Sequence, residues 1–181
     1  MILSNPLMLN SVMYFADGSA APSCGGAWAV VRVQSADDNL FIQSASGKIS
    51  QADSLIAECM AAQQALCWAD EENVTLVVDN RNVHAFLSAK KINQLRPQQK
   101  RPYWPWLLKL MSTRLFRESR GTSIAVKWVK SHTPLSSLPP NPSYDDLLAW
   151  GNHLADRLAA STLKGGNSPD PGELHMMRYL Q

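Results

Sequence analysis

Four acidic residues of this 181-residue chain stand where the sequence could carry chemistry: Asp17, Glu58, Asp79 and Asp156. Asp17 and Asp79 each follow an apolar run that predicts a strand, and chemistry in open α/β sheets tends to lie outside the carboxyl ends of strands. Glu58 lies at the edge of the apolar stripe of a predicted helix. Asp156 shares a helix face with Asn152, four residues earlier. Individually, such acids are usually turn formers or solvated residues, so their chemistry depends on their arrangement.

Three short strands with turns between them precede the first predicted helix and indicate an antiparallel meander. The run VMYFA ends at Asp17-Gly18-Ser19, and AWAVVRV follows a Gly-Gly pair. An Asp-Asp-Asn turn leads to the third strand. The three predicted strands cover residues 12–16, 27–33 and 40–44.

Helical periodicity begins after this meander. Leu55, Cys59, Ala62 and Leu66 recur at helical spacing. VTLVV is a continuous run rich in β-branched residues, which is typical of a central strand covered on both faces. A stretch rich in Pro and Ser predicts a loop before the final helix. The predicted helices are residues 52–70, 82–91, 103–118 and 144–163, the further strands are 74–78 and 123–130, and the loop is 131–143.

The order of these elements indicates an α/β fold with a mixed five-stranded sheet, antiparallel at first and then with parallel strands, flanked by helices. The chain has the length of one domain. We expect an N-terminal extension over residues 1–11 and the domain over 12–164, with an enlarged loop at 131–143. Residues 165–181 are expected to form a loose C-terminal tail.

The net charge of +2 hides an uneven distribution. Residues 81–130, which we call the basic block, contain 12 Lys or Arg and one acid, Glu118, and so carry +11. The rest of the chain carries −9. Such asymmetry favours a polyanionic partner for the basic block. A set of unrelated solvated faces is the alternative interpretation.

Composition excludes several classes of protein. An apolar share of 45% argues against a disordered chain. Cys24, Cys59 and Cys67 are odd in number and show no C-x-x-C spacing, which argues against a disulfide framework and the usual zinc site and favours a reducing compartment. The N-terminus lacks the basic region of a signal peptide, and no apolar run approaches the length of a membrane helix. We therefore expect an intracellular protein, cytoplasmic or nuclear, with no membrane partner.

The ordered motifs resemble those of the ribonuclease H family, particularly the ribonuclease H domains of retroelements. MYFADGSAAPSCGGAWAVV is similar to the family's first hairpin, SLIAECMAAQQAL to its helix with the catalytic Glu, and VTLVVDN to the strand that ends in the second Asp. VKWVKSH is similar to the strand that leads to a mobile His, and NHLADRLA to the closing helix with its Asn and Asp. The resemblance spans about residues 13–161. It implies a ribonuclease H-like fold and a type 1 ribonuclease H.

The resemblance also implies the roles of the acids. Asp17, Glu58, Asp79 and Asp156 would be catalytic and would bind two Mg²⁺ ions, with Mn²⁺ as an alternative. Mg²⁺ prefers carboxylate oxygen, and two ions about 4 Å apart can activate a water and stabilise the leaving 3′ oxygen. His132 would assist proton transfer or product release. Because four close carboxylates repel one another, we expect raised pKa values in the absence of metal.

The substrate implied by the resemblance is an RNA–DNA hybrid, cut within its RNA strand, and a reverse transcriptase domain in the same polyprotein is an expected partner. Polar residues near the acids are expected to contact 2′-hydroxyls or the backbone. The basic block is expected to contact phosphates, which positions a duplex without recognising its sequence. The candidate substrate-binding residues are Ser19, Ser54, Asn80, Asn152, Lys90, Lys91, Arg96, Lys100 and Arg101.

The chain departs from the family pattern near its end. His132 and Asp156 are separated by 23 residues, where the family usually has a short loop, and Arg81 stands where bacterial enzymes often carry Gln. The altered loop after His132 leaves open a catalytically weak or inactive nucleic-acid-binding domain of a larger protein, and Arg81 indicates minor-groove contacts that differ from those of the bacterial enzymes. Exonucleases and integrase-like enzymes of the same fold are less favoured, because the first strand lacks D-x-E and the last acid is Asp rather than Glu.

Overall fold

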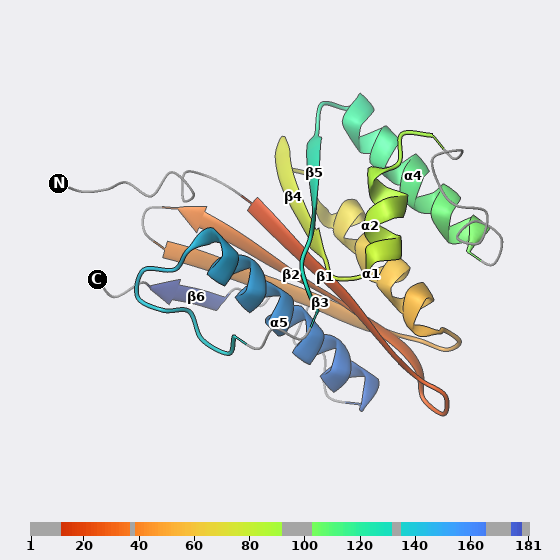
Figure 1. Ribbon diagram of the computed structural model, residues 1–181, viewed down its shortest axis with the longest axis horizontal. Helices are drawn as coiled ribbons and strands as arrows, with labels where there is room; N and C mark the ends of the chain where they lie inside the picture. Colours follow the sequence, from red (N-terminus) through yellow and green to blue (C-terminus); the bar gives the residue numbers. More distant parts are fainter. Residues whose placement is uncertain (1–11, 37–38, 92–102, 132–134, 166–174, 179–181) are drawn as a thin grey trace.

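One mixed sheet with helices on both faces makes up the protein (Figure 1), whose computed structural model describes residues 12–36, 39–91, 103–131, 135–165 and 175–178. The strands are β1 (Val12–Ala21), β2 (Gly25–Ala36), β3 (Asn39–Ile49), β4 (Asn73–Val78), β5 (Ser123–Trp128) and β6 (His175–Arg178). The helices are α1 (Ser54–Trp68), α2 (Arg81–Ser88), α4 (Trp104–Ser119) and α5 (Tyr144–Leu163).

The strand order in the sheet is β5-β4-β1-β2-β3-β6. β1, β2 and β3 form an antiparallel meander, and β4 and β5 continue the sheet in parallel with β1. This confirms the α/β class and the expected change from antiparallel to parallel pairing. Because β1 and β4 are parallel neighbours, both strands run toward the same end of the sheet, where their carboxyl ends lie.

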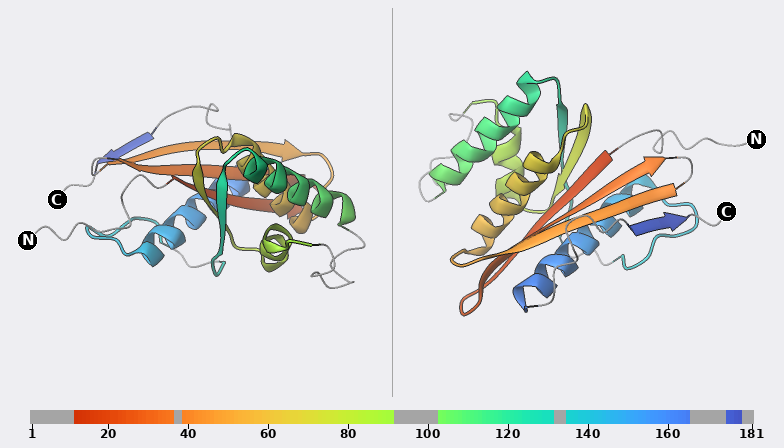
Figure 2. Two further views of the ribbon diagram at one scale, coloured as in Figure 1. Left: turned by 90° about the horizontal axis from the view of Figure 1, so that it is seen from above. Right: turned by 180° about the vertical axis from the view of Figure 1, so that it is seen from behind.

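Two clusters of buried side chains attach the helices to the two faces of the sheet. Leu76 of β4 belongs to the cluster under α1, α2 and α4, together with Phe86 of α2. The next residue, Val77, belongs to the cluster under α5, together with Trp150. In Figure 1 α5 lies in front of the sheet, and in the reversed view of Figure 2 it lies partly behind the strands. β4 is therefore covered on both faces, as its continuous apolar run predicts. Among the described helices, none has both the length and the apolarity that crossing a membrane requires.

Two arginines of the basic block cap the C-termini of helices with their side chains. Arg114 of α4 is buried and donates hydrogen bonds to the backbone carbonyls of Leu87 and Ala89 at the end of α2. Arg117 donates to the carbonyl of Cys67 at the end of α1, at 2.7 Å. Basic side chains satisfy the free carbonyls of a helix C-terminus in this way. α2 accordingly ends at residue 88, three residues before its predicted end.

The C-terminal segment contributes a sixth strand to the sheet. β6 pairs antiparallel with the first residues of β3, from Asn39 opposite Arg178 to Ile42 opposite His175. The expectation of a loose tail is therefore corrected at these four residues. The sheet consists of the five expected strands with β6 added beside β3.

Candidate active site

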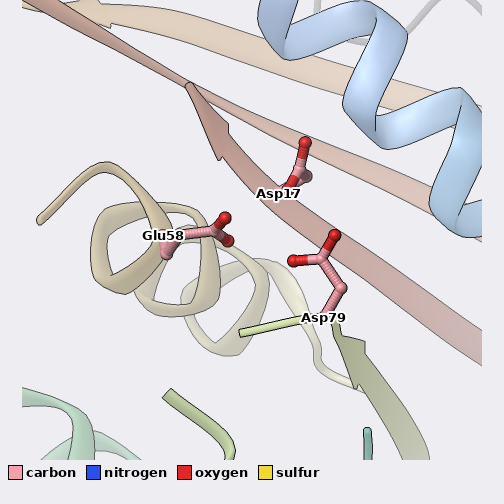
Figure 3. Close-up of side chains that lie close together, drawn as sticks. All are labelled: Asp17, Glu58 and Asp79. Carbon is pink, nitrogen blue, oxygen red and sulfur yellow. The ribbon is translucent and has the colours of Figure 1, made fainter. Parts of the chain in front are cut away.

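The register between β1 and β4 brings two of the four acids together. Phe15 of β1 pairs with Val77 of β4, so the residues two positions further on, Asp17 and Asp79, stand at the same level. β1 continues from there in its pairing with β2, whereas β4 ends at Val78. Asp79 therefore leaves the sheet beside Asp17, and Figure 3 shows the two side chains close together.

Glu58 reaches the same place because α1 lies unusually close to β1. A Cβ atom at Gly18 would lie 2.3 Å from the backbone nitrogen of Glu58 and 2.3 Å from the carbonyl carbon of Ala57. Only glycine permits this approach. Asp53 caps α1 by accepting a hydrogen bond from the backbone N–H of Ile56 at 2.8 Å, which fixes where the helix begins. The Asp-Gly pair of β1 thus supplies one acid and the contact surface that places another.

Asp17, Glu58 and Asp79 form a compact group, which we call the carboxylate cluster. Each offers a carboxylate oxygen, and these oxygens all lie within 4.8 Å of one another. Asp17 and Glu58 are only 3% and 8% exposed, and Asp79 is half-buried. Burial, reinforced by the negative charges of neighbouring carboxylates, raises the pKa of both Asp17 and Glu58. The cluster therefore favours protons or a cation between its members.

α5 approaches the cluster from the opposite face of the sheet. A Cβ atom at Gly151 would lie 2.3 Å from the ring of Phe15, so this helix also requires glycine where it crosses β1. The next residue, Asn152, is buried and donates a hydrogen bond from Nδ2 to Oδ2 of Asp79 at 3.4 Å. Asp156 follows one turn later and adds its negative charge to the field at the cluster. Its carboxylate is half-buried and lies outside the group of three that spans 4.8 Å.

The donor set fits a hard divalent cation. The cluster offers only carboxylate oxygens, which Mg²⁺ and Mn²⁺ prefer over nitrogen or sulfur ligands. Beyond their burial, the negative charges of Asp79 and Asp156 raise the pKa of Asp17, and those of Asp17 and Asp79 raise the pKa of Glu58; bound positive charge relieves this repulsion. Oδ1 of Asn152 is also buried beside the cluster and has no hydrogen-bond partner among the described residues. The structure thus supports the expected divalent-metal site at these acids.

The predicted substrate-binding residues lie in different settings. Ser19 is half-buried on β1 two residues after Asp17, and Ser54 is exposed as the first residue of α1. The side chain of Asn80 caps α2, where it accepts from two backbone N–H groups at 2.9 and 3.2 Å. Lys90 and Lys91 are exposed just beyond α2. The predicted residues that lie outside the described part of the chain are Arg96, Lys100, Arg101 and His132.

Trp128 and Arg81 contribute to the site without having been predicted as site residues. The indole Nε1 of Trp128 donates a hydrogen bond to the backbone carbonyl of Asp79 at 2.9 Å. The guanidinium of Arg81 lies 4.7 Å from the centroid of the Trp128 ring. From the sequence, Arg81 is a member of the basic block and a departure from the bacterial pattern, with no role of its own. The pairing of β4 with β5 is the signal that could have indicated Trp128, because it places this residue opposite Val78.

A mixed sheet with this strand order, helices on both faces and acids gathered beside β1 and β4 is the architecture of the ribonuclease H fold. The family model described as RNase H matches residues 9–164, which is most of the chain. The chain therefore belongs to the ribonuclease H family. This assignment confirms the enzyme class that the motifs predicted, a ribonuclease H. Comparison with curated protein sequences finds no match.

Solved ribonuclease H structures share this fold at low sequence identity. The N-terminal RNase H domain of rv2228c from Mycobacterium tuberculosis is 19% identical, with a TM-score of 0.60 over 87% of this chain and 96% of that chain. RNase H1 from the halophilic archaeon Halobacterium salinarum is 19% identical, with a TM-score of 0.56 over 86% and 99%. The foamy viral protease-reverse transcriptase in complex with an RNA/DNA hybrid is 17% identical, with a TM-score of 0.64 over 88% of this chain and 21% of that chain. These similarities confirm the fold.

Proposed function

We propose that this chain is an endonuclease that hydrolyses the RNA strand of RNA–DNA hybrids with the help of divalent metal ions. The observation that carries the proposal is the convergence of Asp17, Glu58 and Asp79 within 4.8 Å in a chain of the ribonuclease H family. A phosphodiester-cleaving site of this kind needs several carboxylates that can share bound cations. That a structural neighbour was solved with an RNA/DNA hybrid supports the proposed substrate.

The carboxylate cluster and Asp156 would hold Mg²⁺ or Mn²⁺, and the family resemblance favours two ions. When bound, the metal supplies an activated water and positive charge for the leaving 3′ oxygen. The chain's own residues position these groups. Burial of Asp17 and Glu58 shields the cluster from bulk water, and the amide of Asn152 orients the carboxylate of Asp79.

The substrate is proposed to contact polar and basic residues around the cluster. Ser19 and Ser54 come from β1 and the start of α1, the two elements that supply Asp17 and Glu58, so their hydroxyls are candidates for contact with the RNA strand. Lys90 and Lys91, exposed beyond α2, are candidates for phosphate contact. His132 keeps its proposed role in proton transfer or product release. Asn80 is a weaker candidate, because its side chain already caps α2.

Cleavage of a labelled hybrid tests the proposal. The wild-type chain is incubated with an RNA–DNA hybrid in Mg²⁺ and then in Mn²⁺, and is compared with the Asp79→Asn variant. We expect internal cuts in the RNA strand from the wild type and a loss of about a hundredfold or more in the variant, since a metal ligand is removed. Asp70→Asn is the matched control, because Asp70 is exposed two residues beyond the C-terminal end of α1, whereas Glu58 lies in the N-terminal half of that helix. If the wild type cuts no better than Asp79→Asn, the chain is a binding domain and not a nuclease.

A retroelement origin and a reverse transcriptase domain in the same polyprotein are part of this proposal. The supporting observation is that the matched foamy viral chain is a protease-reverse transcriptase, of which the matched region is 21%. Sequencing the transcript on both sides of the region that encodes this chain tests the idea. An open reading frame with reverse transcriptase motifs joined to this chain is the expected result, and a stop codon on each side with no such motifs would contradict it.

A further inference from the structure

The end of β5 contacts the backbone of a cluster residue. Trp128 is the last residue of β5 and stands opposite Val78 of β4. The backbone N–H of Val129 donates to the carbonyl of Val78 at 3.0 Å. The next carbonyl along, that of Asp79, accepts from the indole Nε1–H of Trp128 at 2.9 Å. The indole N–H of Trp128 thus extends the hydrogen bonding between β4 and β5 by one residue, to the carbonyl of Asp79.

Arg81 contacts the same indole from the other side of the turn. Its guanidinium carbon lies 4.7 Å from the centroid of the Trp128 ring, within the range of a cation–π contact. Arg81 is the first residue of α2 and follows Asp79 by two positions, and the intervening Asn80 caps the helix. The Trp128 side chain therefore contacts both ends of the turn from Asp79 to Arg81.

The charge of Arg81 is available to a ligand. Its side chain is exposed, and among the described residues no carboxylate lies within ion-pair distance of it. A guanidinium stacked on an aromatic ring keeps its in-plane N–H donors free for a phosphate. Arg81 is also two residues from Asp79, whose carboxylate belongs to the cluster. A cation in this place suits the phosphate of a strand that enters the cluster.

We propose that Trp128 is a positioning residue for Asp79. Arg81 holds the Trp128 indole in place, and the guanidinium of Arg81 also binds a phosphate of the nucleic-acid strand. The two residues form what we call the Trp128–Arg81 clamp. The choice of ligand rests on the proposed function. Because one indole joins both contacts, a change at either residue is transmitted to the backbone that carries the Asp79 carboxylate.

Trp128→Phe tests the positioning role. Phenylalanine keeps an aromatic ring for Arg81 but lacks the N–H that holds the Asp79 carbonyl. We expect kcat on a labelled hybrid to fall about 10-fold and the Mg²⁺ concentration for half-maximal rate to rise, since outer-shell partners of metal ligands typically contribute this much. KM for the hybrid stays unchanged. A merely structural role would lower the melting temperature without moving the Mg²⁺ midpoint, and that result would overturn the positioning role.

Two substitutions of Arg81 separate its charge from its stacking. Arg81→Ala is expected to raise KM and to reduce the slope of log KM against log salt concentration by about 1, as loss of one phosphate contact does. Arg81→Lys restores that slope, because the charge remains, but it raises the Mg²⁺ midpoint, because the planar stack is lost. An unchanged salt slope in Arg81→Ala would overturn the phosphate contact.

Arg120 provides the matched control. Its guanidinium lies over the ring of Phe116 at 5.5 Å, the same type of contact, but it lies just before the first residue of β5, whereas Arg81 contacts the last residue of that strand. At about 3.3 Å per residue, β5 separates it from Trp128 by more than 15 Å. Arg120→Ala is expected to change neither the Mg²⁺ midpoint nor the salt slope. Equal effects at Arg81 and Arg120 would show a general charge effect and would overturn the clamp.

Binding measurements distinguish failure of the clamp from failure of the proposed function. Hybrid affinity is measured by fluorescence anisotropy in Ca²⁺, and metal affinity by the rise in melting temperature with Mg²⁺. If the wild type never cleaves, but Arg81→Ala weakens hybrid binding and Trp128→Phe weakens metal binding, the clamp stands and the proposed function falls. If the wild type cleaves and both variants match it in every measurement, the Trp128–Arg81 clamp is rejected and the proposed function is kept.

Discussion

Replacing Gly18 by alanine tests whether the contact between β1 and α1 sets the position of Glu58. The added Cβ atom would lie 2.3 Å from two backbone atoms of α1 and 2.7 Å from a third, the carbonyl oxygen of Ala57. These atoms are backbone, so no side-chain rotation can relieve the overlap. Either the helix moves away from the strand or β1 bends away from the helix.

The size of the effect follows from that overlap. Ordinary contact begins near 3.4 Å, so α1 must move by about 1.1 Å relative to Gly18. Overpacking of this kind lowers the free energy of unfolding by about 1–3 kcal/mol, which for a chain of this length lowers the melting temperature by about 2–12 °C. A displacement of about 1 Å in a catalytic group can lower the rate about 100-fold. We therefore expect a modest loss of stability and a much larger loss of activity.

The assay compares Gly18→Ala with wild type below both melting temperatures, so that each protein is folded. Thermal unfolding gives the stability, and cleavage of a labelled hybrid gives kcat and the Mg²⁺ midpoint. Gly121→Ala is the matched control: its backbone φ of 92° makes the same substitution strained, but its Cβ would have no atom within 4 Å. The control is expected to lose about 1 kcal/mol through strain and to keep its kcat.

Two results would refute this reasoning. A Gly18→Ala variant with wild-type kcat and Mg²⁺ midpoint would show that Glu58 does not depend on the contact. Equal losses of kcat in Gly18→Ala and Gly121→Ala would show that strain or lost stability lowers activity in general, without any displacement of the cluster.

Three further substitutions test other parts of the structure. Burial and like charge raise the pKa of Asp17, so its neutral form stabilises the fold at low pH and this stability is lost as the pH rises toward the raised value. With EDTA present, the wild type should lose more than about 1 kcal/mol of unfolding free energy between pH 5 and 9, and Asp17→Asn should lose less. Urea titrations at each pH measure this, and a wild-type stability that rises with pH would contradict the prediction. Asn152→Ala removes the amide that donates to Asp79 and should lower kcat roughly 10-fold with little change in melting temperature, whereas an unchanged kcat would exclude an orienting role. Arg114→Met leaves two carbonyls at the end of α2 without their donor and should lower the unfolding free energy by about 2–4 kcal/mol. Arg120 is exposed at the end of α4, so Arg120→Ala should change the unfolding free energy little. Equal effects of the two substitutions in urea unfolding would contradict the structural role of Arg114.

Elements with strong local signals were predicted closely from sequence. The final helix begins and ends at the predicted residues because Ser143 and Asp146 form a capping box and a Gly-Gly pair follows. The end of α2 could not be predicted in this way. It is set by Arg114, a residue 25 positions away from the last carbonyl that it caps, so the cause lies in tertiary contact.

The candidate site was predictable in its acids but not in its supports. Of the four acids that the motifs implied, Asp17, Glu58 and Asp79 come together within 4.8 Å. The close helix contacts at Gly18 and Gly151 and the hydrogen bond from the Trp128 indole had no local signal that predicts them. The basic block shows the opposite limit. Its charge indicated a polyanionic partner, yet the side chains of Arg114 and Arg117 bind helix carbonyls, and the direction of a side chain cannot be counted from composition.

The short strand β6 has a consequence for how the chain can be handled and how it behaves in solution. A bare outer strand offers its backbone N–H and C=O groups to a strand of another molecule. β6 covers the outer side of β3 from Asn39 to Ile42, and β3 has eleven residues. A chain cut at residue 164, where the family match ends, would lose β6 and leave the whole outer side of β3 open. The segment beyond the family match therefore replaces part of a long outer strand by an outer strand of four residues, and short outer strands limit pairing between separate molecules.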